Sequence, residues 1–222
     1  MLISEKHKFV YIKTHKTAST SVEGLLEHLC TPEGHKPEHA QSEIYSEYGY
    51  VSGRAGEYKS TDLLLPHATA QQIEKVIGSK KFNDYQKIYC VRNPYDKVVS
   101  WFWFVMPMTT KTRVENDFDA ARTLFRDWLA MRPHLPVDRK YYVLNRKKID
   151  ATLIRFESLR DDIISCLEGI GAEVDFDALP EWKTEQRRHN VNHFMDYYDD
   201  TSRKIVEKKF SFDFKHFGYK HM

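Results

Sequence analysis

The sequence predicts an α/β fold in which a central, mainly parallel sheet is flanked by helices on both faces. Three short apolar runs predict buried strands, and each is followed by a stretch with the apolar spacing of a helix. Parallel strands need long crossover connections, which helices usually supply. With 222 residues, of which 41% are hydrophobic, the chain is long enough for one sizeable core. We therefore expect a single domain over residues 1–222.

The first strand and helix lie near the start of the chain. Phe9–Ile12 combines β-branched and aromatic residues, as a short buried strand does. Apolar residues then recur at helical spacing from Ser21 to Leu29. Residues 31–60 show little periodicity, so we expect a long irregular excursion outside the core. Thr69–Ile77 predicts a further helix.

The second strand is expected at Lys87–Val91. Asn93 and Pro94 follow it, and these residue types mark the N-cap and the first position of a helix, which we expect to run through Phe104. This unit therefore repeats the order of strand, short connection and helix.

The third strand is expected at Ala151–Phe156, with a helix over Leu159–Ile170 that ends at Gly171. The aromatic and charged segment His193–Tyr219 predicts one further helix and an ordered C-terminal segment. Three units of strand and helix are what the α/β class requires.

Charge and cysteine content exclude several classes of protein. The chain has 34 basic and 32 acidic residues, so its formal charge of +2 gives no strong field for binding nucleic acid. No apolar run is long enough for a leader peptide or a membrane-spanning helix, so we expect a cytoplasmic protein. Cys30, Cys90 and Cys166 form no C-x-x-C pair, which predicts buried reduced thiols and no metal site.

The stretch "FVYIKTHKTASTSVEGLL" (residues 9–26) has the features of a phosphate cradle. A strand, a tight loop and a helix direct backbone N–H groups and the positive end of the helix dipole at one point. Lys16 adds a mobile positive charge. Hydroxyl donors come from four residues: Thr17, Ser19, Thr20 and Ser21. The alternative is that Thr20 or Ser21 only caps a surface helix. The loop lacks the glycines of G-x-x-x-x-G-K-[ST], which argues against an ATPase or GTPase.

A second anion site is predicted in "IYCVRNPYDKVVSWFWF" (residues 88–104). Arg92 directly follows the strand, and Ser100 lies about two turns along the helix. The planar guanidinium can donate two parallel hydrogen bonds to a phosphate. The alternative is a structural Arg92 paired with Asp96 or another carboxylate.

These two stretches resemble the sulfotransferases that use 3′-phosphoadenosine 5′-phosphosulfate (PAPS), in particular soluble bacterial or viral members of the carbohydrate-directed branch. "HKTASTS" (15–21) is similar to the family's loop for the 5′-phosphosulfate, and "RNPYDKVVS" (92–100) to its 3′-phosphate site. "LIRFESLRDD" (153–162) and residues 197–219 are similar to later family segments. The resemblance implies a P-loop-like three-layer fold. It also implies a PAPS-dependent O-sulfotransferase that releases adenosine 3′,5′-bisphosphate and needs no metal.

The resemblance implies the residues that bind the donor nucleotide. They are His15, Lys16, Thr17, Ala18, Ser19, Thr20, Ser21, Arg92 and Ser100. Arg188, His189 and Asn192 occupy the place of a family loop that folds over the nucleotide, although a solvated basic surface is the alternative. The family usually has glycines where Ala18 and Ser19 stand, and a Cβ is unfavourable there if φ is positive.

The resemblance also implies two catalytic residues, His67 and Lys16. His67 in "LLLPHATAQQI" is similar to a family histidine close to the acceptor, and an imidazole is a fitting base for a hydroxyl. His15 is the rival base because it adjoins Lys16. Lys16 would stabilise charge on the bridging oxygen as the bond to sulfur breaks.

The acceptor is expected to be a saccharide or glycolipid hydroxyl, with no nucleic acid and no membrane span involved. Rings and polar groups suited to sugars occur in residues 31–60, at Tyr45, Tyr48, Tyr50, Arg54 and Tyr58. An ordinary surface loop has the same composition. Basic residues at 139–140 and 146–148 face either an acidic saccharide or solvent.

Two alternative functions remain open. A P-loop-type small-molecule kinase would need a metal-binding carboxylate and a glycine-rich loop, neither of which is evident. A non-catalytic nucleotide-binding or glycan-binding module would keep the phosphate motifs and lack the base.

Overall fold

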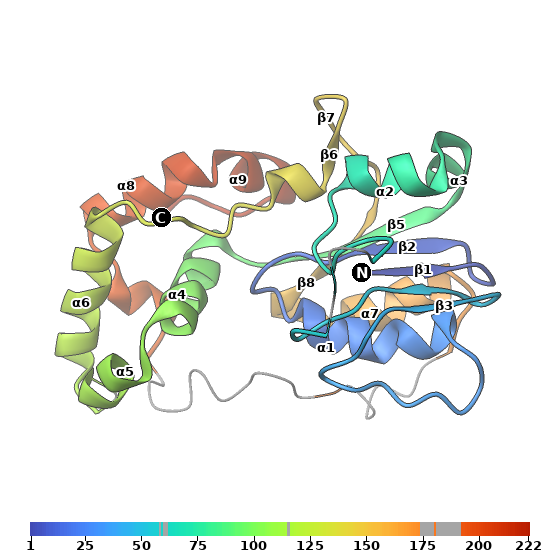
Figure 1. Cartoon of the computed structure of the whole chain (residues 1–222). Coiled ribbons are helices and arrows are strands. Elements are labelled where there is room, and N and C mark those ends of the chain that lie inside the picture. Colours follow the sequence, from blue (N-terminus) through green and yellow to red (C-terminus); the bar gives the residue numbers. More distant parts are fainter. Residues whose placement is uncertain (58, 60–61, 115, 174–179, 181–191) are drawn as a thin grey trace. The chain divides into compact units, whose positions relative to one another are not determined.

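The computed structural model describes residues 1–57, 59, 62–114, 116–173, 180 and 192–222 (Figure 1). The chain forms two compact units. The first unit comprises Met1–Val91 and Asp138–Trp182, and the second comprises Arg92–Val137 and Lys183–Met222.

The first unit is built on a six-stranded sheet with the strand order β3-β4-β1-β2-β5-β8. Its strands are β1 (Leu2–Ser4), β2 (Phe9–Ile12), β3 (Ile44–Ser46), β4 (Gly49–Val51), β5 (Gln86–Val91) and β8 (Thr152–Arg155). A separate two-stranded hairpin consists of β6 (Val143–Leu144) and β7 (Lys147–Lys148). The three predicted strands are therefore confirmed as β2, β5 and β8, within two residues at each end.

The sheet combines parallel and antiparallel pairs. β2 pairs with β5 and β5 with β8 in parallel, whereas β1, β3 and β4 pair with antiparallel neighbours. The α/β class is confirmed, and the predicted strands form the parallel part of a mixed sheet. Because β2 and β5 are parallel neighbours, both end at the same edge of the sheet, which is where ligands bind in such folds.

Helices cover both faces of this sheet (Figure 1). One face carries α1 (Ser19–Leu26) and α7 (Leu159–Gly169), and the other carries α2 (Ala70–Ile77) and α3 (Ser79–Asp84). Short 3₁₀ turns lie at η1 (Glu27–Cys30), η2 (Arg139–Tyr141) and η3 (Phe156–Ser158). The side chains under α1 and α7, among them Val22, Leu26, Ile88 and Ile163, are fully or almost fully buried. Burial of this apolar area stabilises the layers.

The second unit is helical. It contains α4 (Pro94–Val105), α5 (Met108–Val114), α6 (Phe118–Ala130), η6 (Phe194–Tyr197), α8 (Asp200–Lys209) and α9 (Ser211–Phe217). Its core is aromatic, with Phe102, Phe125 and Tyr197 in edge-to-face contact. The Asn93 side chain accepts a hydrogen bond from the Tyr95 N–H, and Pro94 stands at the first helical position of α4, as predicted.

Two predictions about the elements are wrong. Residues 31–60 are not all outside the core, because β3 and β4 extend the sheet and Tyr50 and Arg54 are only 2% and 1% exposed. The C-terminal segment forms two helices, α8 and α9, where one was expected.

The buried thiols are confirmed, since Cys30, Cys90 and Cys166 are all buried and free. No helix within the described ranges is long and apolar enough to cross a membrane.

Candidate active site

The connection from β2 to α1 is a tight loop over residues 13–18. Lys16 and Ala18 both have φ near +58°, the left-handed region that non-glycine residues rarely adopt. Ala18 is the N-cap of α1, and its carbonyl accepts the N–H groups of Ser21 and Val22. The earlier N–H groups of the helix have no intrahelical partner, so they remain available to an anion.

A chain of hydroxyl contacts fixes this loop. The Thr14 hydroxyl donates to the Cys90 carbonyl at 2.7 Å, so the 2.9 Å contact between the Thr14 and Thr17 hydroxyls has Thr17 as donor. The Ser19 hydroxyl donates to the Thr14 carbonyl. The Tyr11 hydroxyl donates to the Ser19 carbonyl at 3.0 Å. The Thr17 and Ser19 hydroxyl protons are therefore used within the loop. What these residues can offer an anion is their backbone N–H groups.

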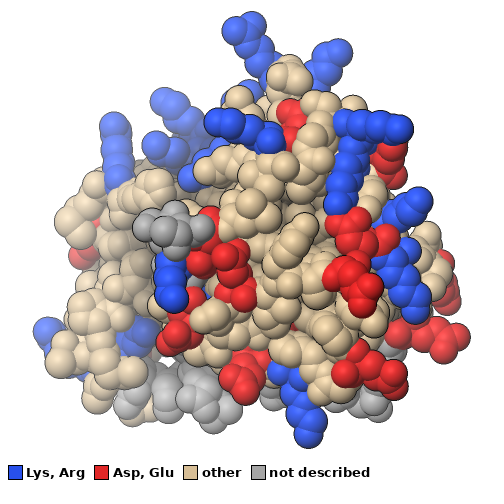
Figure 2. All heavy atoms as spheres, turned by 45° about the vertical axis from the view of Figure 1, so that its right-hand side comes forward, with Lys and Arg blue, Asp and Glu red and all other residues tan. Residues whose placement is uncertain are grey.

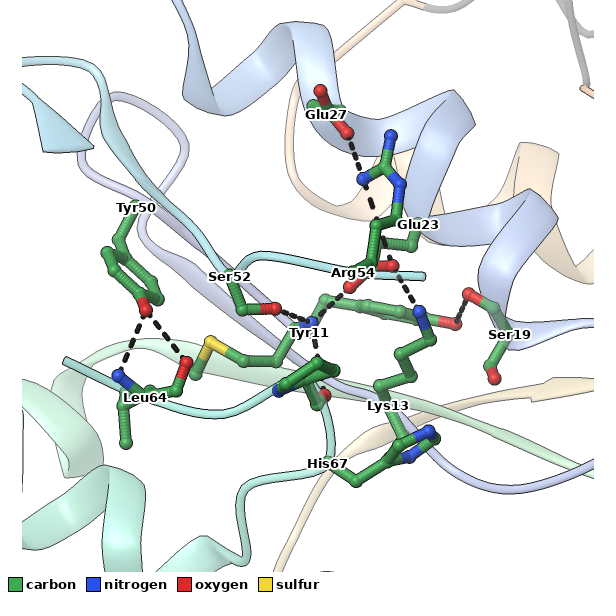
Figure 3. A network of polar contacts seen from close by, with 12 residues as sticks. Tyr11, Lys13, Ser19, Glu23, Glu27, Tyr50, Ser52, Arg54, Leu64 and His67 are labelled. Carbon is green, nitrogen blue, oxygen red and sulfur yellow. Dashed lines mark hydrogen bonds and ion pairs between the residues drawn. The ribbon is translucent and has the colours of Figure 1, made fainter. Parts of the chain in front are cut away.

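A buried ion pair joins the two ends of the loop (Figure 3). Lys13, directly after β2, donates to Glu23 of α1, which is fully buried. Burial alone would raise the pKa of Glu23, but the positive charges of the Met1 α-amino group and of Lys13 outweigh it and lower that pKa to about 2. Glu23 therefore stays ionised, and the Lys13 pair holds β2 and α1 at a fixed separation.

Two histidine rings stack at this loop, and one of them comes from the loop itself. The rings of His15 and His67 lie 4.1 Å apart between centroids with an interplanar angle of 9°. Tyr141 of η2 packs against both rings, at 5.4 Å and 6.2 Å. We call His15 and His67 the histidine pair. From the sequence, His67 was expected to be the base and His15 was its rival. The structure places their two rings in contact.

Hydrogen bonds orient each ring of the histidine pair. His67 Nδ1 donates to the Lys13 carbonyl at 3.0 Å, and His15 Nδ1 donates to Asp138 Oδ1 at 2.7 Å. Burial, followed by the positive charges of His15 and Lys13, lowers the pKa of His67 to about 3. His67 is therefore neutral near pH 7, with the lone pair of the imidazole on Nε2.

The second predicted anion motif starts directly after β5. Arg92 is buried, and its Nε donates to Asp96 at 2.6 Å, which is the pairing that the sequence left open as an alternative. Ser100 lies on α4 and is partly buried. This ion pair fixes the guanidinium at the start of α4.

The comparison with protein families covers almost the whole chain. The model of the sulfotransferase family matches residues 1–220. The chain belongs to the sulfotransferase family. Members of this family transfer a sulfuryl group, so the protein is a transferase by family. No curated protein and no solved structure shows a significant match to the chain.

The remaining residues proposed for the sulfotransferase site lie as follows. Thr20 is partly buried and Ser21 is buried in the first turn of α1. Asn192 is exposed, while Arg188 and His189 lie outside the described residues. Tyr50 and Arg54 were expected to contact a sugar, but both are buried and bonded inside the unit, so that expectation is wrong for them.

Asp138 is the residue that sequence reasoning missed. It is fully buried, and it also accepts the His15 backbone N–H at 2.9 Å. It lies 123 positions from His15, in a stretch with no recognisable motif. Only the tertiary fold brings this carboxylate to the loop.

Proposed function

We propose that this sulfotransferase transfers the sulfuryl group of PAPS to a hydroxyl of a saccharide or glycolipid, within one domain that includes both units. The observation that carries the proposal is the loop between β2 and α1, fixed by its own hydroxyls and placed directly beside the histidine pair. Such a loop offers donors to an anion and places a base next to them. No metal is needed for this step.

The donor set of the loop fits a phosphosulfate. Residues 14–21 contain no carboxylate, and Lys16 is half-buried beside the start of α1. Backbone N–H groups and an ammonium are the groups that bind phosphate and sulfate oxygens. We assign the 5′-phosphosulfate to this loop and the 3′-phosphate to Arg92 and Ser100. Lys16 then neutralises charge on the oxygen that leaves sulfur.

The acceptor proposal draws on the segment that follows Asp138. Arg139 and Lys140 are exposed on η2, whose Tyr141 packs against the histidine pair, and Arg146 and Lys147 are exposed on the hairpin of β6 and β7. Lys and Arg side chains project at the top of the face in Figure 2, the level at which Figure 1 places this hairpin. A row of cations suits an acidic saccharide.

Thermal stability in the presence of nucleotides tests the donor. A ligand that binds only the folded state stabilises it by about 2.7 kcal/mol at one hundred times its Kd. We expect adenosine 3′,5′-bisphosphate to raise the Tm without magnesium, and ADP and ATP to raise it far less. Arg92→Ala should remove this shift.

The matched control is Arg122→Ala, which removes an arginine from an exposed ion pair with Asp119 in α6. This variant should keep the full response to the bisphosphate. A preference for ATP with magnesium would favour the kinase, and the absence of any shift would contradict the proposed donor.

A further inference from the structure

Asp138 gives one histidine of the pair a charged partner. Its side chain is 1% exposed, whereas that of His15 is 28% exposed. A buried carboxylate is costly unless hydrogen bonds and positive charge compensate it. Here the His15 backbone N–H and ring N–H both donate to it. The ring bond places the proton of neutral His15 on Nδ1 and leaves the lone pair on Nε2.

His67 has the same ring orientation but a weaker partner. Its Nδ1 bonds to a neutral carbonyl, which orients the ring without balancing a positive charge. A neutral imidazole becomes positively charged once it has taken a proton, and an anion at the opposite nitrogen stabilises that charge. The pKa of His67, lowered to about 3 first by burial, is far from the value that suits a base near pH 7.

The stacking couples the charges of the two rings. At 4.1 Å between centroids, two imidazolium ions would repel each other strongly, so a positive charge on one ring disfavours a positive charge on the other. Among the described residues, the charged and titratable groups beside the pair include Asp138 before η2, Tyr141 in η2, Lys13 after β2 and the Met1 α-amino group, with Lys16 next to His15 along the chain. Asp138 is the anion among them, and it contacts His15.

We propose that His15 is the general base of sulfuryl transfer, that Asp138 is its positioning residue, and that His67 stays neutral. This assignment rests on the proposed function. His15 is adjacent to Lys16, with Cα atoms about 3.8 Å apart, so the base lies within the phosphosulfate loop.

In the proposed step, one bond to sulfur forms and one bond to sulfur breaks. The acceptor hydroxyl gives its proton to Nε2 of His15 as its oxygen bonds to sulfur. The bond from sulfur to the bridging oxygen breaks, and that oxygen keeps the electron pair on adenosine 3′,5′-bisphosphate. Lys16 compensates the charge that forms there, and Asp138 compensates the imidazolium. His15 then releases the proton to solvent.

The test compares His15→Gln, Asp138→Asn and the double variant in sulfuryl transfer from PAPS to a saccharide. We expect each single variant to lower kcat by about 10²-fold to 10⁴-fold, the usual contribution of a general base. The double variant should be no slower than His15→Gln, because residues that act as a unit are not additive. The acid limb of the pH profile of kcat/KM should disappear in His15→Gln and remain in His67→Gln.

The control is His28→Gln, because His28 also bonds through Nδ1 to a backbone carbonyl, that of Leu25, and lies outside the site. It should leave kcat unchanged. Transfer by His15→Gln within threefold of the wild-type rate would overturn the assignment of His15 as the base and leave the proposed function standing. If the losses of kcat in the two single variants added up in the double variant, Asp138 would only stabilise the fold of the loop.

A readout that does not depend on activity tests the contact between His15 and Asp138 separately from the proposed function. Nitrogen NMR of labelled histidine shows which ring nitrogen of His15 carries the proton. We expect Nδ1–H in the wild-type protein and a shift toward Nε2–H in Asp138→Asn. The same tautomer in both proteins would overturn the positioning role of Asp138, whichever reaction the enzyme performs.

Discussion

Ala18 adopts a left-handed backbone conformation at φ 58° without being a glycine. The left-handed conformation costs an L-residue about 1–2 kcal/mol. Glycine avoids this cost, but it loses about 0.4–1 kcal/mol more conformational entropy on folding than alanine does. We therefore predict that Ala18→Gly stabilises the protein by about 0.5–1 kcal/mol in urea unfolding.

The matched control for this change is Ala120→Gly in α6, where the backbone is helical. That substitution should destabilise the protein by about 1 kcal/mol. Equal destabilisation by both variants would contradict the strain that we assign to Ala18.

We predict that His67 makes the stability of the protein depend on pH. Its pKa is about 3 in the folded state and near 6.5 when exposed, so between these values the unfolded chain binds the extra proton. Stability should fall as the pH drops from 6.5 toward 3, with a slope from this group of at most about 1.4 kcal/mol per pH unit. Urea unfolding of wild type and His67→Gln at pH 7, 6, 5 and 4 measures it. A stability difference that does not change with pH would contradict the prediction.

At the scale of elements, buried charges join β4 to α1 and η1. Arg54 follows β4, donates to Glu27 of η1, and lies 3.9 Å from Glu23 of α1 (Figure 3). It also donates to the Glu38 carbonyl. Removing Arg54 leaves Glu27 buried without its main cation. We predict that Arg54→Met lowers the free energy of unfolding by about 3–5 kcal/mol.

The comparison is Lys81→Met, which breaks the ion pair with Glu5. Both side chains of that pair are about one-third exposed. Its loss should cost about 0–1 kcal/mol, since exposed pairs contribute little. Similar losses in the two variants would show that the network around Arg54 does not stabilise this part of the sheet.

The elements that could be predicted from the sequence are those with a local signal. β2, β5 and β8 are continuous apolar runs, and α4 has Asn93 and Pro94 at its start. β1, β3 and β4 have three residues each, too few for a recognisable period, and their pairing with distant strands defines them. Gly49 shows this dependence, because a Cβ there would lie 2.0 Å from the Ile3 carbonyl oxygen.

The residues of the candidate site also divide into those with a local sequence signal and those without one. The loop with Lys16 and the place of His67 before α2 follow from local sequence, and the structure brings His67 to His15. Asp138 had no local signal, because its role depends on a contact across the fold. The hydroxyls of Thr17 and Ser19 looked like ligand donors, yet tertiary contacts use their protons within the loop.

At the scale of the whole molecule, the sulfotransferase match extends across both compact units. The chain is nearly neutral, with a formal charge of +2, so the proposed attraction of an acidic acceptor would have to come from local groups of cations such as those on the hairpin of β6 and β7. Raising ionic strength from 0.01 to 0.15 M shortens the screening length from about 30 to 8 Å. We predict that the KM for an acidic saccharide rises over this range.

The double variant Arg146→Gln, Lys147→Gln should raise that KM by about threefold to tenfold at low salt and flatten its salt dependence. The control pair is Lys111→Gln, Arg113→Gln in α5, which removes the same charge elsewhere. An equal effect of both pairs would attribute the salt dependence to net charge and would exclude a docking role for the hairpin.

The most direct test of the central claim follows the sulfur atom. Wild-type protein is incubated with sulfur-labelled PAPS and a panel of neutral and acidic saccharides, with a chelator present. We predict that label appears on a saccharide in proportion to the adenosine 3′,5′-bisphosphate released. Release of free sulfate alone would contradict sulfuryl transfer to a sugar hydroxyl. So would the absence of transfer together with phosphorylation of the saccharide in a parallel incubation that contains ATP and magnesium and no chelator.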